Sequence, residues 1–135
     1  MQLAEIQDNF SFFDSWEDKY RFVIDLGRDL VPLGESNKVD ANLIRGCQSQ
    51  VWIVSTYDKT TDRLTLAIDS DAHIVRGLIA IVLTAYNEQS PTEILDFDIE
   101  GLFEDLQLLQ HLSPTRGNGL KAMVARIRDV ASKAA

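Results

Sequence analysis

The fold class is decided by residues 63–87, which read RLTLAIDSDAHIVRGLIAIVLTAYN. Over residues 63–69 apolar and polar side chains alternate, and this period of two is typical of a strand with one buried face. Asp69-Ser70-Asp71 then supplies residue types that cap helix N-termini. In the helix expected over about 72–87, apolar residues lie almost all round the axis. The sequence therefore predicts a half-buried strand followed by a central, buried helix.

A second strand is expected immediately before this one. Residues 51–57 read VWIVSTY, and the polar stretch 58–62 joins them to the next strand as an antiparallel hairpin. A short strand at about 42–45 is expected to lie against this pair. The result is a small, curved antiparallel sheet of about three strands.

Helices are expected on either side of the sheet in the sequence. Ser15-Trp16-Glu17-Asp18 and Ser90-Pro91-Thr92-Glu93 have the form of capping boxes, and Ser113-Pro114 is a further helix start. The predicted helices cover about 3–10, from Ser15 to about Leu30, from Pro91, about 99–105, and from Pro114 to near the end. The order of helices, sheet and helices predicts a single α+β domain over residues 1–135.

Composition excludes several classes of protein. The 135 residues carry a formal net charge of −8, so the phosphate backbone of a nucleic acid would be repelled and no nucleic-acid partner is expected. No apolar run approaches the roughly 20 residues of a membrane span. The acidic start lacks the features of a secretory signal or a transit peptide. A lone cysteine suits a reducing compartment, so the expected location is cytoplasmic.

The single cysteine, Cys47, lies in the run IRGCQSQV over residues 44–51. Glycine precedes it and three polar residues follow, an order that places the thiol at the tip of a loop. It has no partner for an intramolecular disulfide, and with only two scattered histidines the chain lacks the ligand spacing of a zinc site. The pattern therefore indicates thiol chemistry directed at another molecule.

The octet Gly46–Ile53, GCQSQVWI, strongly resembles the signature of the SufE family of sulfur-acceptor proteins. Further segments match the family in order and spacing along almost the whole chain: Trp16–Tyr20, Leu26-Gly27, Asp69–Asp71 with Ile74–Leu78, Leu112–Arg116, and Gly119-Leu120. The residues after the cysteine, Gln48-Ser49-Gln50, are closer to SufE proper than to its CsdE relatives.

The resemblance implies a fold of the SufE/IscU type and a function. Cys47 would accept persulfide sulfur from a SufS-type cysteine desulfurase, stimulate that enzyme, and pass the sulfur to an iron–sulfur scaffold such as SufBCD. The pyridoxal phosphate would belong to the desulfurase, and this chain would bind no cofactor or metal of its own. A homodimer is compatible with the sequence, which does not fix the oligomeric state. The alternatives are a CsdE-like acceptor for another desulfurase and a regulatory binding module that carries no sulfur.

Several residues are expected to support Cys47. Gly46 would give the loop the backbone freedom to move its thiol between a sheltered and an extended position. Gln48, Ser49 and Gln50 would shape the loop through backbone hydrogen bonds. Two further residues, Asp71 and Arg116, each allow two interpretations.

Arg116 would be a cation beside the thiolate, or would pair with a carboxylate such as Asp71 or Glu17. Asp71 would cap the following helix, hold the cysteine loop through hydrogen bonds, or do both. Trp52 is interpreted as a core or sheet-face residue. His73 and His111 could act as bases in a cysteine hydrolase, but they do not occupy positions that the family requires.

Overall fold

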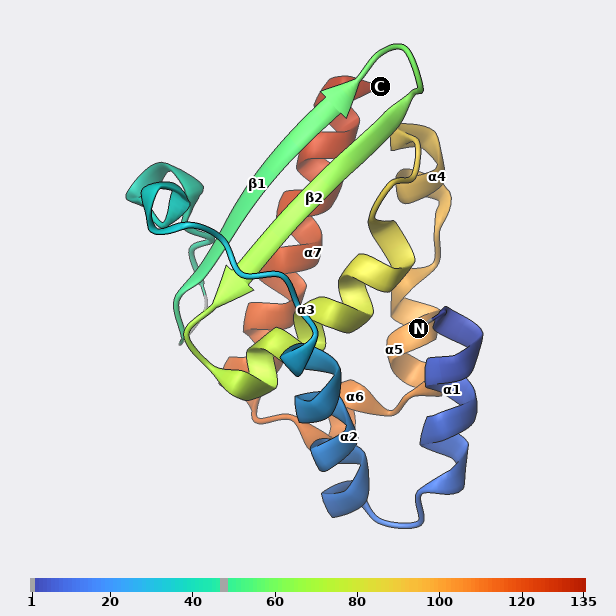
Figure 1. The fold of residues 1–135 in the computed structure, drawn as a ribbon. Helices are drawn as coiled ribbons and strands as arrows, with labels where there is room; N and C mark the ends of the chain where they lie inside the picture. Colours follow the sequence, from blue (N-terminus) through green and yellow to red (C-terminus); the bar gives the residue numbers. More distant parts are fainter. Residues whose placement is uncertain (1, 47–48) are drawn as a thin grey trace.

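The computed structural model describes residues 2–46 and 49–135, and Cys47 and Gln48 lie outside the described residues. Figure 1 shows the hairpin at one side of the molecule, with helices packed against it and beneath it. In chain order the elements are α1 (Leu3–Phe12), α2 (Trp16–Arg28), the 3₁₀ turns η1 (Glu35–Asn37) and η2 (Asp40–Asn42), β1 (Val51–Asp58), β2 (Arg63–Ser70), α3 (His73–Tyr86), α4 (Pro91–Asp96), α5 (Ile99–Asp105), α6 (Leu108–His111) and α7 (Pro114–Ala134).

The hairpin forms as predicted. β1 and β2 are antiparallel, with Val51 opposite Ser70 at one end and Asp58 opposite Arg63 at the other. The alternation read in β2 is confirmed, because Leu64, Leu66 and Ile68 are buried while Arg63 and Thr65 are exposed. The buried face of the strand lies against the helices, and the α+β class is confirmed.

The third strand expected at about 42–45 is shorter than predicted. Among the described residues the sheet has two strands, and Leu43 forms only an isolated bridge to Trp52. Next to it, the Ile44 N–H donates to the Val51 carbonyl at 2.8 Å. The physical reason lies just upstream, where η2 ends at Asn42 and leaves too few extended residues to continue the ladder.

The central helix α3 is buried as predicted. Ile79, Ile81 and Val82 are fully inaccessible to solvent, and burial of an isoleucine stabilises the fold by roughly 1.5–3 kcal/mol. α2 crosses α3 where Gly27 meets Gly77, and a Cβ built on Gly27 would lie 2.6 Å from the Gly77 backbone nitrogen. The two helices therefore touch through their backbones, which explains why neither position can carry a side chain.

The predicted capping of α3 is wrong in detail. Its N-cap is Ala72, which makes no side-chain capping bond, whereas Ser70 and Asp69 belong to the end of β2. The Ser70 hydroxyl still accepts from the Ala72 N–H at 3.2 Å, and the Asp69 carboxylate is used elsewhere. The reciprocal capping box of Ser90 and Glu93 is confirmed at α4.

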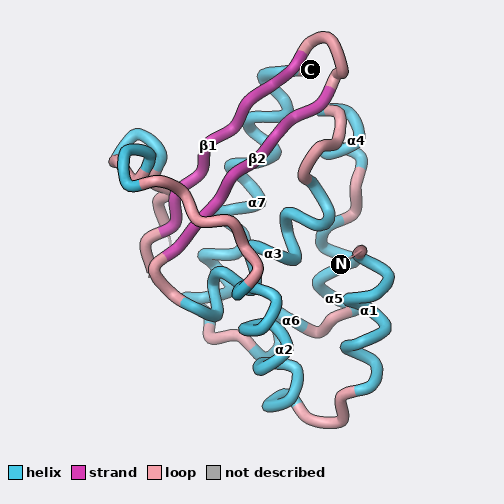
Figure 2. Tube along the Cα trace, in the orientation of Figure 1, coloured by secondary structure: helices cyan, strands magenta, loops and turns pink. Residues whose placement is uncertain are grey.

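The helix starts elsewhere follow the sequence more closely. The Ser15 side chain accepts from the Asp18 N–H at the start of α2, and the Ser113 side chain accepts from the Arg116 N–H at the start of α7. The four-residue helix α6 was not predicted. Figure 2 shows it as a short helical stretch between α5 and the long C-terminal helix.

Candidate functional site around the cysteine loop

The site is built from the residues that flank Cys47 and Gln48, because these two lie outside the described residues. On the upstream side Gly46 has a φ of +91°, a backbone region that favours glycine. A Cβ built there would lie 3.6 Å from the Ala122 side chain of α7, so this end of the loop lies close to that helix. Conformation, rather than crowding, therefore requires glycine at this position.

The downstream end of the loop is bonded to the end of β2. The Gln50 N–H donates to the Asp71 Oδ1 at 3.1 Å, and the Asp71 N–H donates to the Gln50 carbonyl at 3.4 Å. Of the two interpretations of Asp71, the structure places the side chain on the cysteine loop and not on the N-terminus of α3. Two mutual hydrogen bonds thus fix the point where the loop enters β1.

A small cavity lies beside the loop. Its volume is about 20 Å³, close to the space that one water molecule requires. Its walls come from the start of β1, from α3 and from the first half of α7: Ser49, Val51, Val75, Leu78, Thr115, Arg116, Gly119, Leu120 and Met123. Most of these side chains are apolar, so the cavity would shelter a weakly hydrated group such as sulfur.

Arg116 contributes the cation to this cavity. Its Nη1 is buried and has no hydrogen-bond partner within residues 2–46 and 49–135. Among the described residues, neither carboxylate proposed as its partner forms an ion pair with it: Asp71 accepts from the Gln50 N–H, and Glu17 pairs with Arg21 at 3.2 Å. Buried donors in proteins are nearly always hydrogen-bonded. The guanidinium is therefore available to an anion at the cavity, and the N-terminus of α7 adds to the positive potential.

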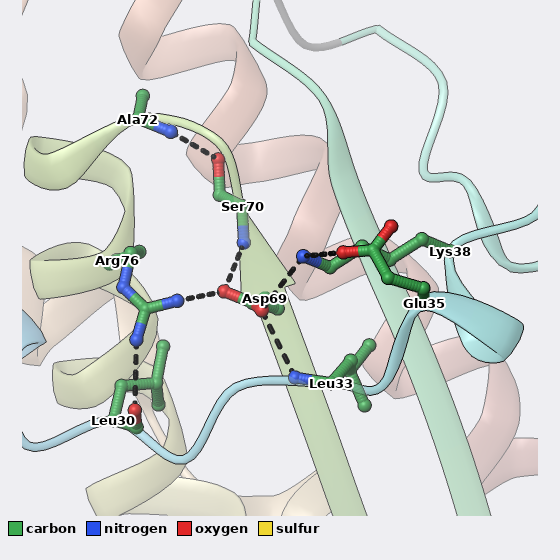
Figure 3. Close-up of polar contacts among 8 residues, drawn as sticks. All are labelled: Leu30, Leu33, Glu35, Lys38, Asp69, Ser70, Ala72 and Arg76. Carbon is green, nitrogen blue, oxygen red and sulfur yellow. Dashed lines mark hydrogen bonds and ion pairs between the residues drawn. The ribbon is translucent and has the colours of Figure 1, made fainter.

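Sequence reasoning missed the buried carboxylate of Asp69, which is only 1% exposed (Figure 3). Its oxygens accept from the Leu33 N–H at 3.0 Å and the Ser70 N–H at 2.8 Å, and they pair with Arg76 Nη1 and, at 3.7 Å, with Lys38 Nζ. A buried carboxylate is stable only when paired and hydrogen-bonded. We call Asp69, Arg76 and Lys38 with their bonded backbone groups the Asp69 cluster.

The Asp69 cluster joins the strap, defined here as residues 30–45, to the sheet. Arg76 Nη2 donates to the Leu30 carbonyl at 2.8 Å where the strap leaves α2. Farther along, Lys38 Nζ lies 5.4 Å from the ring centroid of Trp52, directly across the hairpin from Asp69. The strap then leads into Gly46, so the cluster fixes the segment that delivers the chain to the cysteine. Trp52 is 8% exposed and is a sheet-face residue, as predicted.

The two histidines lie away from the cavity lining. His73 is exposed at the start of α3, and the ring of His111 stacks on Trp16 with centroids 4.5 Å apart and planes at 12°. In the described part of the chain no group of three or more His, Cys, Asp or Glu side chains is placed to hold a metal ion. The described helices also include none with the length and apolar character to cross a membrane.

Comparison with known proteins gives concordant results. The family model for SufE, described as an Fe–S metabolism associated domain, matches residues 4–131. A SufE-like protein of Rhizobium meliloti is 44% identical over 131 residues, covering 96% of this chain and 94% of the relative. A SufE-like protein of Rhizobium etli is 45% identical over 131 residues, covering 96% and 88%.

The fold itself also has a solved counterpart. A solution structure of a protein from Thermus thermophilus superposes with a TM-score of 0.76 at 17% identity, covering 98% of this chain and 94% of the other. That likeness shows the fold, and the family follows from the sequence comparisons. The chain belongs to the SufE family, whose domain serves iron–sulfur metabolism.

Proposed function

We propose that this protein is a sulfur carrier that accepts persulfide sulfur on Cys47 from a SufS-type cysteine desulfurase and passes it on for iron–sulfur cluster assembly. The observation that carries the proposal is the arrangement around the loop: a SufE-family chain whose single cysteine is flanked by a left-handed Gly46, and by Gln50 bonded to Asp71. The apolar cavity lies beside it, lined in part by Arg116, whose buried Nη1 has no hydrogen-bond partner among the described residues.

The transfer step resembles thiol–disulfide exchange. The Cys47 thiolate attacks the outer sulfur of the donor's cysteine persulfide, a new S–S bond forms on Cys47, and the donor cysteine leaves as a thiolate. The total oxidation state of sulfur is unchanged, and no external oxidant or reductant is needed. Because the thiolate is the nucleophile, positive potential from Arg116 and the N-terminus of α7 would favour the reactive form.

The neighbouring residues have distinct supporting roles in this proposal. Gly46 allows the loop a backbone conformation that other residues rarely adopt, and Gln48 and Ser49 would shape its tip. Gln50 and Asp71 hold its downstream end against β2. Between transfers, the cavity next to Ser49 and Met123 would shelter the persulfide from reductants.

The same proposal assigns the partners. The donor is a pyridoxal-phosphate desulfurase of the SufS type, which the carrier stimulates by removing its persulfide. The acceptor is an iron–sulfur scaffold such as SufBCD, and the exchange takes place in the cytoplasm. The carrier itself holds no cofactor. Gln48-Ser49-Gln50 favours SufE-type partners over CsdE-type ones.

The test is to incubate the protein with a SufS-type desulfurase and cysteine and then record its intact mass. Wild-type protein is expected to gain one sulfur, about 32 Da, that a thiol reductant removes. The matched control is Cys47→Ser, which should gain nothing while still binding the desulfurase. Stimulation of the desulfurase by Cys47→Ser equal to that by wild type would instead identify a regulatory module that carries no sulfur.

A second measurement examines Arg116. Arg116→Gln keeps hydrogen-bond donors but removes the charge, and we expect it to slow sulfur loading by about tenfold. Arg21→Gln is the control, because Arg21 pairs with Glu17 on an exposed helix face. Equal loading rates in the two variants would contradict a role for the Arg116 charge.

A further inference from the structure

A groove lies between α5 and α7, in a part of the molecule that the sulfur-carrier proposal does not use. Its volume is about 650 Å³, far larger than the cavity beside the cysteine loop. The floor is apolar, because Ile99, Phe103 and Val124 line it and are buried. Leu109, which also lines the groove, is one of the few large apolar side chains that are exposed, at 38%. An open apolar hollow of this size favours a bound partner or ligand.

The two sides of the groove carry opposite charges. On α5 the exposed Glu100 and Glu104 lie one helical turn apart. On α7 Lys121 and Arg128 lie two turns apart, about 10 Å along the helix axis. Within residues 2–46 and 49–135, none of these four side chains forms an ion pair. The charges on both sides are therefore free to pair with groups that lie between them.

An α-helix suits these walls better than an extended chain. Both walls are helices, and away from its ends a helix bonds its own backbone N–H and C=O groups internally. An extended segment would bury its backbone groups against walls that offer them no partners. A helix carries no such cost and presents side chains at i, i+3, i+4 and i+7. The lining face of α7 has the same spacing, in Lys121, Val124, Ala125 and Arg128.

We propose that the groove between α5 and α7 binds an amphipathic helix of a partner protein. The apolar stripe of that helix lies on the floor of the groove. A row of Lys or Arg faces Glu100 and Glu104, and a row of Asp or Glu faces Lys121 and Arg128. Turning the helix end for end would bring like charges together, so the two rows also fix its direction. The proposal goes beyond the sulfur-carrier function and does not depend on it.

The groove adjoins the cysteine loop through α7. Ala122, whose side chain lies 3.6 Å from a Cβ built on Gly46, directly follows Lys121 in the helix. Successive residues of a helix point about 100° apart around its axis. The loop and the groove therefore lie on neighbouring faces of α7. A helix bound in the groove is held next to the loop, on a different face of α7 from Gly46.

A synthetic helical peptide tests the groove directly. The probe is a hydrocarbon-stapled peptide of about 15 residues, with leucines at i, i+3, i+4 and i+7, lysines along one flank and glutamates along the other. A titration followed by NMR of the protein amides should give a dissociation constant of about 100 µM or tighter, with the shifts centred on α5 and α7. A peptide with its leucines dispersed around the helix, and a proline-containing peptide that stays extended, should not bind at about 1 mM.

Charge reversal on one side of the groove tests the recognition. Glu100→Lys combined with Glu104→Lys should weaken binding of the probe at least about tenfold. The same double variant should prefer a second peptide in which glutamates replace the lysines. The matched control is Asp96→Lys combined with Asp105→Lys, which makes the same change in net charge at exposed positions outside the groove lining. It should bind the probe within about twofold of wild type.

Three results would overturn the proposal. The first is wild-type protein that does not bind the probe at about 1 mM. The second is equal affinity for the extended peptide or for the peptide with dispersed leucines, which would show that the groove does not select an amphipathic helix. The third is reversal of the groove charges that changes binding no more than the control pair does.

Discussion

The two ends of the hairpin are held in different ways. At the end beside the cysteine loop, Asp69 is buried and bonded to charged side chains and to the backbone of the strap. At the turn, the polar contacts are exposed: Tyr57 donates to Asp62 at 2.7 Å, and Arg63 pairs with Glu93 at 2.9 Å. The comparison shows that costly buried charge is concentrated where the strap that leads to the cysteine loop joins the hairpin.

The strongest test of this comparison makes the same change at both ends. Asp69→Asn leaves Arg76 without its charged partner in a largely buried site, so we expect a loss of about 3–5 kcal/mol in the free energy of unfolding. Asp62→Asn at the turn should change it by less than about 0.5 kcal/mol, because asparagine tolerates the positive φ of this exposed position. Urea denaturation measures both. Equal losses would remove the distinction between the two ends.

The second test compares two glycines, Gly34 within the strap and Gly46 immediately after it. Gly46→Pro forces a φ near −65° on a position at +91°, so we expect the fold to remain and sulfur loading of Cys47 to fall by about tenfold or more. Gly34→Pro is the control, since Gly34 already has a φ of −65°. Mass spectrometry after incubation with desulfurase gives the loading. Unchanged loading in Gly46→Pro would argue against a loop that needs this backbone conformation.

A smaller effect is expected at Asp71. Asp71→Ala removes the acceptor of the Gln50 N–H and should cost about 1 kcal/mol of unfolding free energy, together with slower sulfur loading. Asp71→Asn retains an oxygen at the same position and should lie close to wild type. If Asp71→Asn were as slow as Asp71→Ala, the carboxylate charge would matter more than the hydrogen bond.

The smallest effect concerns Glu93 at the turn end. Hydrogen bonds from Ser90 lower the pKa of this carboxyl, and Arg63 adds to the shift. A lowered pKa in the folded state means that Glu93 stabilises the protein near neutral pH, and that this contribution is lost as the pH falls through the lowered pKa. Glu93→Gln should therefore flatten slightly the loss of stability between about pH 6 and pH 3. A variant with the same pH profile as wild type would show that the shift does not affect folding.

Local chemistry explains which elements were predictable. The alternation in β2, the capping box at Ser90 and the apolar surround of α3 are signals carried by a few neighbouring residues, and each produced the expected element. The family was identified for the same reason, because the cysteine octet and the other matching motifs are each runs of neighbouring residues.

Long-range contacts explain what was missed. Asp69 was read as part of a helix cap because carboxylate oxygens often accept hydrogen bonds from the first N–H groups of a helix. In the structure its carboxylate instead accepts from the N–H of Leu33, which lies 36 residues earlier. The third strand failed because η2 coils the residues that would have extended it. A pattern of neighbouring residues does not show which distant group a side chain will bind in the folded chain. For Arg116, sequence alone left two environments open. Among the described residues it forms no ion pair with Asp71 or Glu17, and its place beside the thiolate stays a prediction.

The contact of Gly27 with Gly77 has a mechanical consequence. With no side chains between them at this point, the backbones of α2 and α3 are in direct contact, so we expect the two helices to move together. The strap, which leads into the cysteine loop, follows α2. β2, which pairs with the strand after the loop, leads into α3. The segments on both sides of the loop are therefore connected to the same pair of helices. We therefore expect relative movement of the strap and the hairpin to arise in the segments that link them to this helix pair, and not from sliding of α2 on α3.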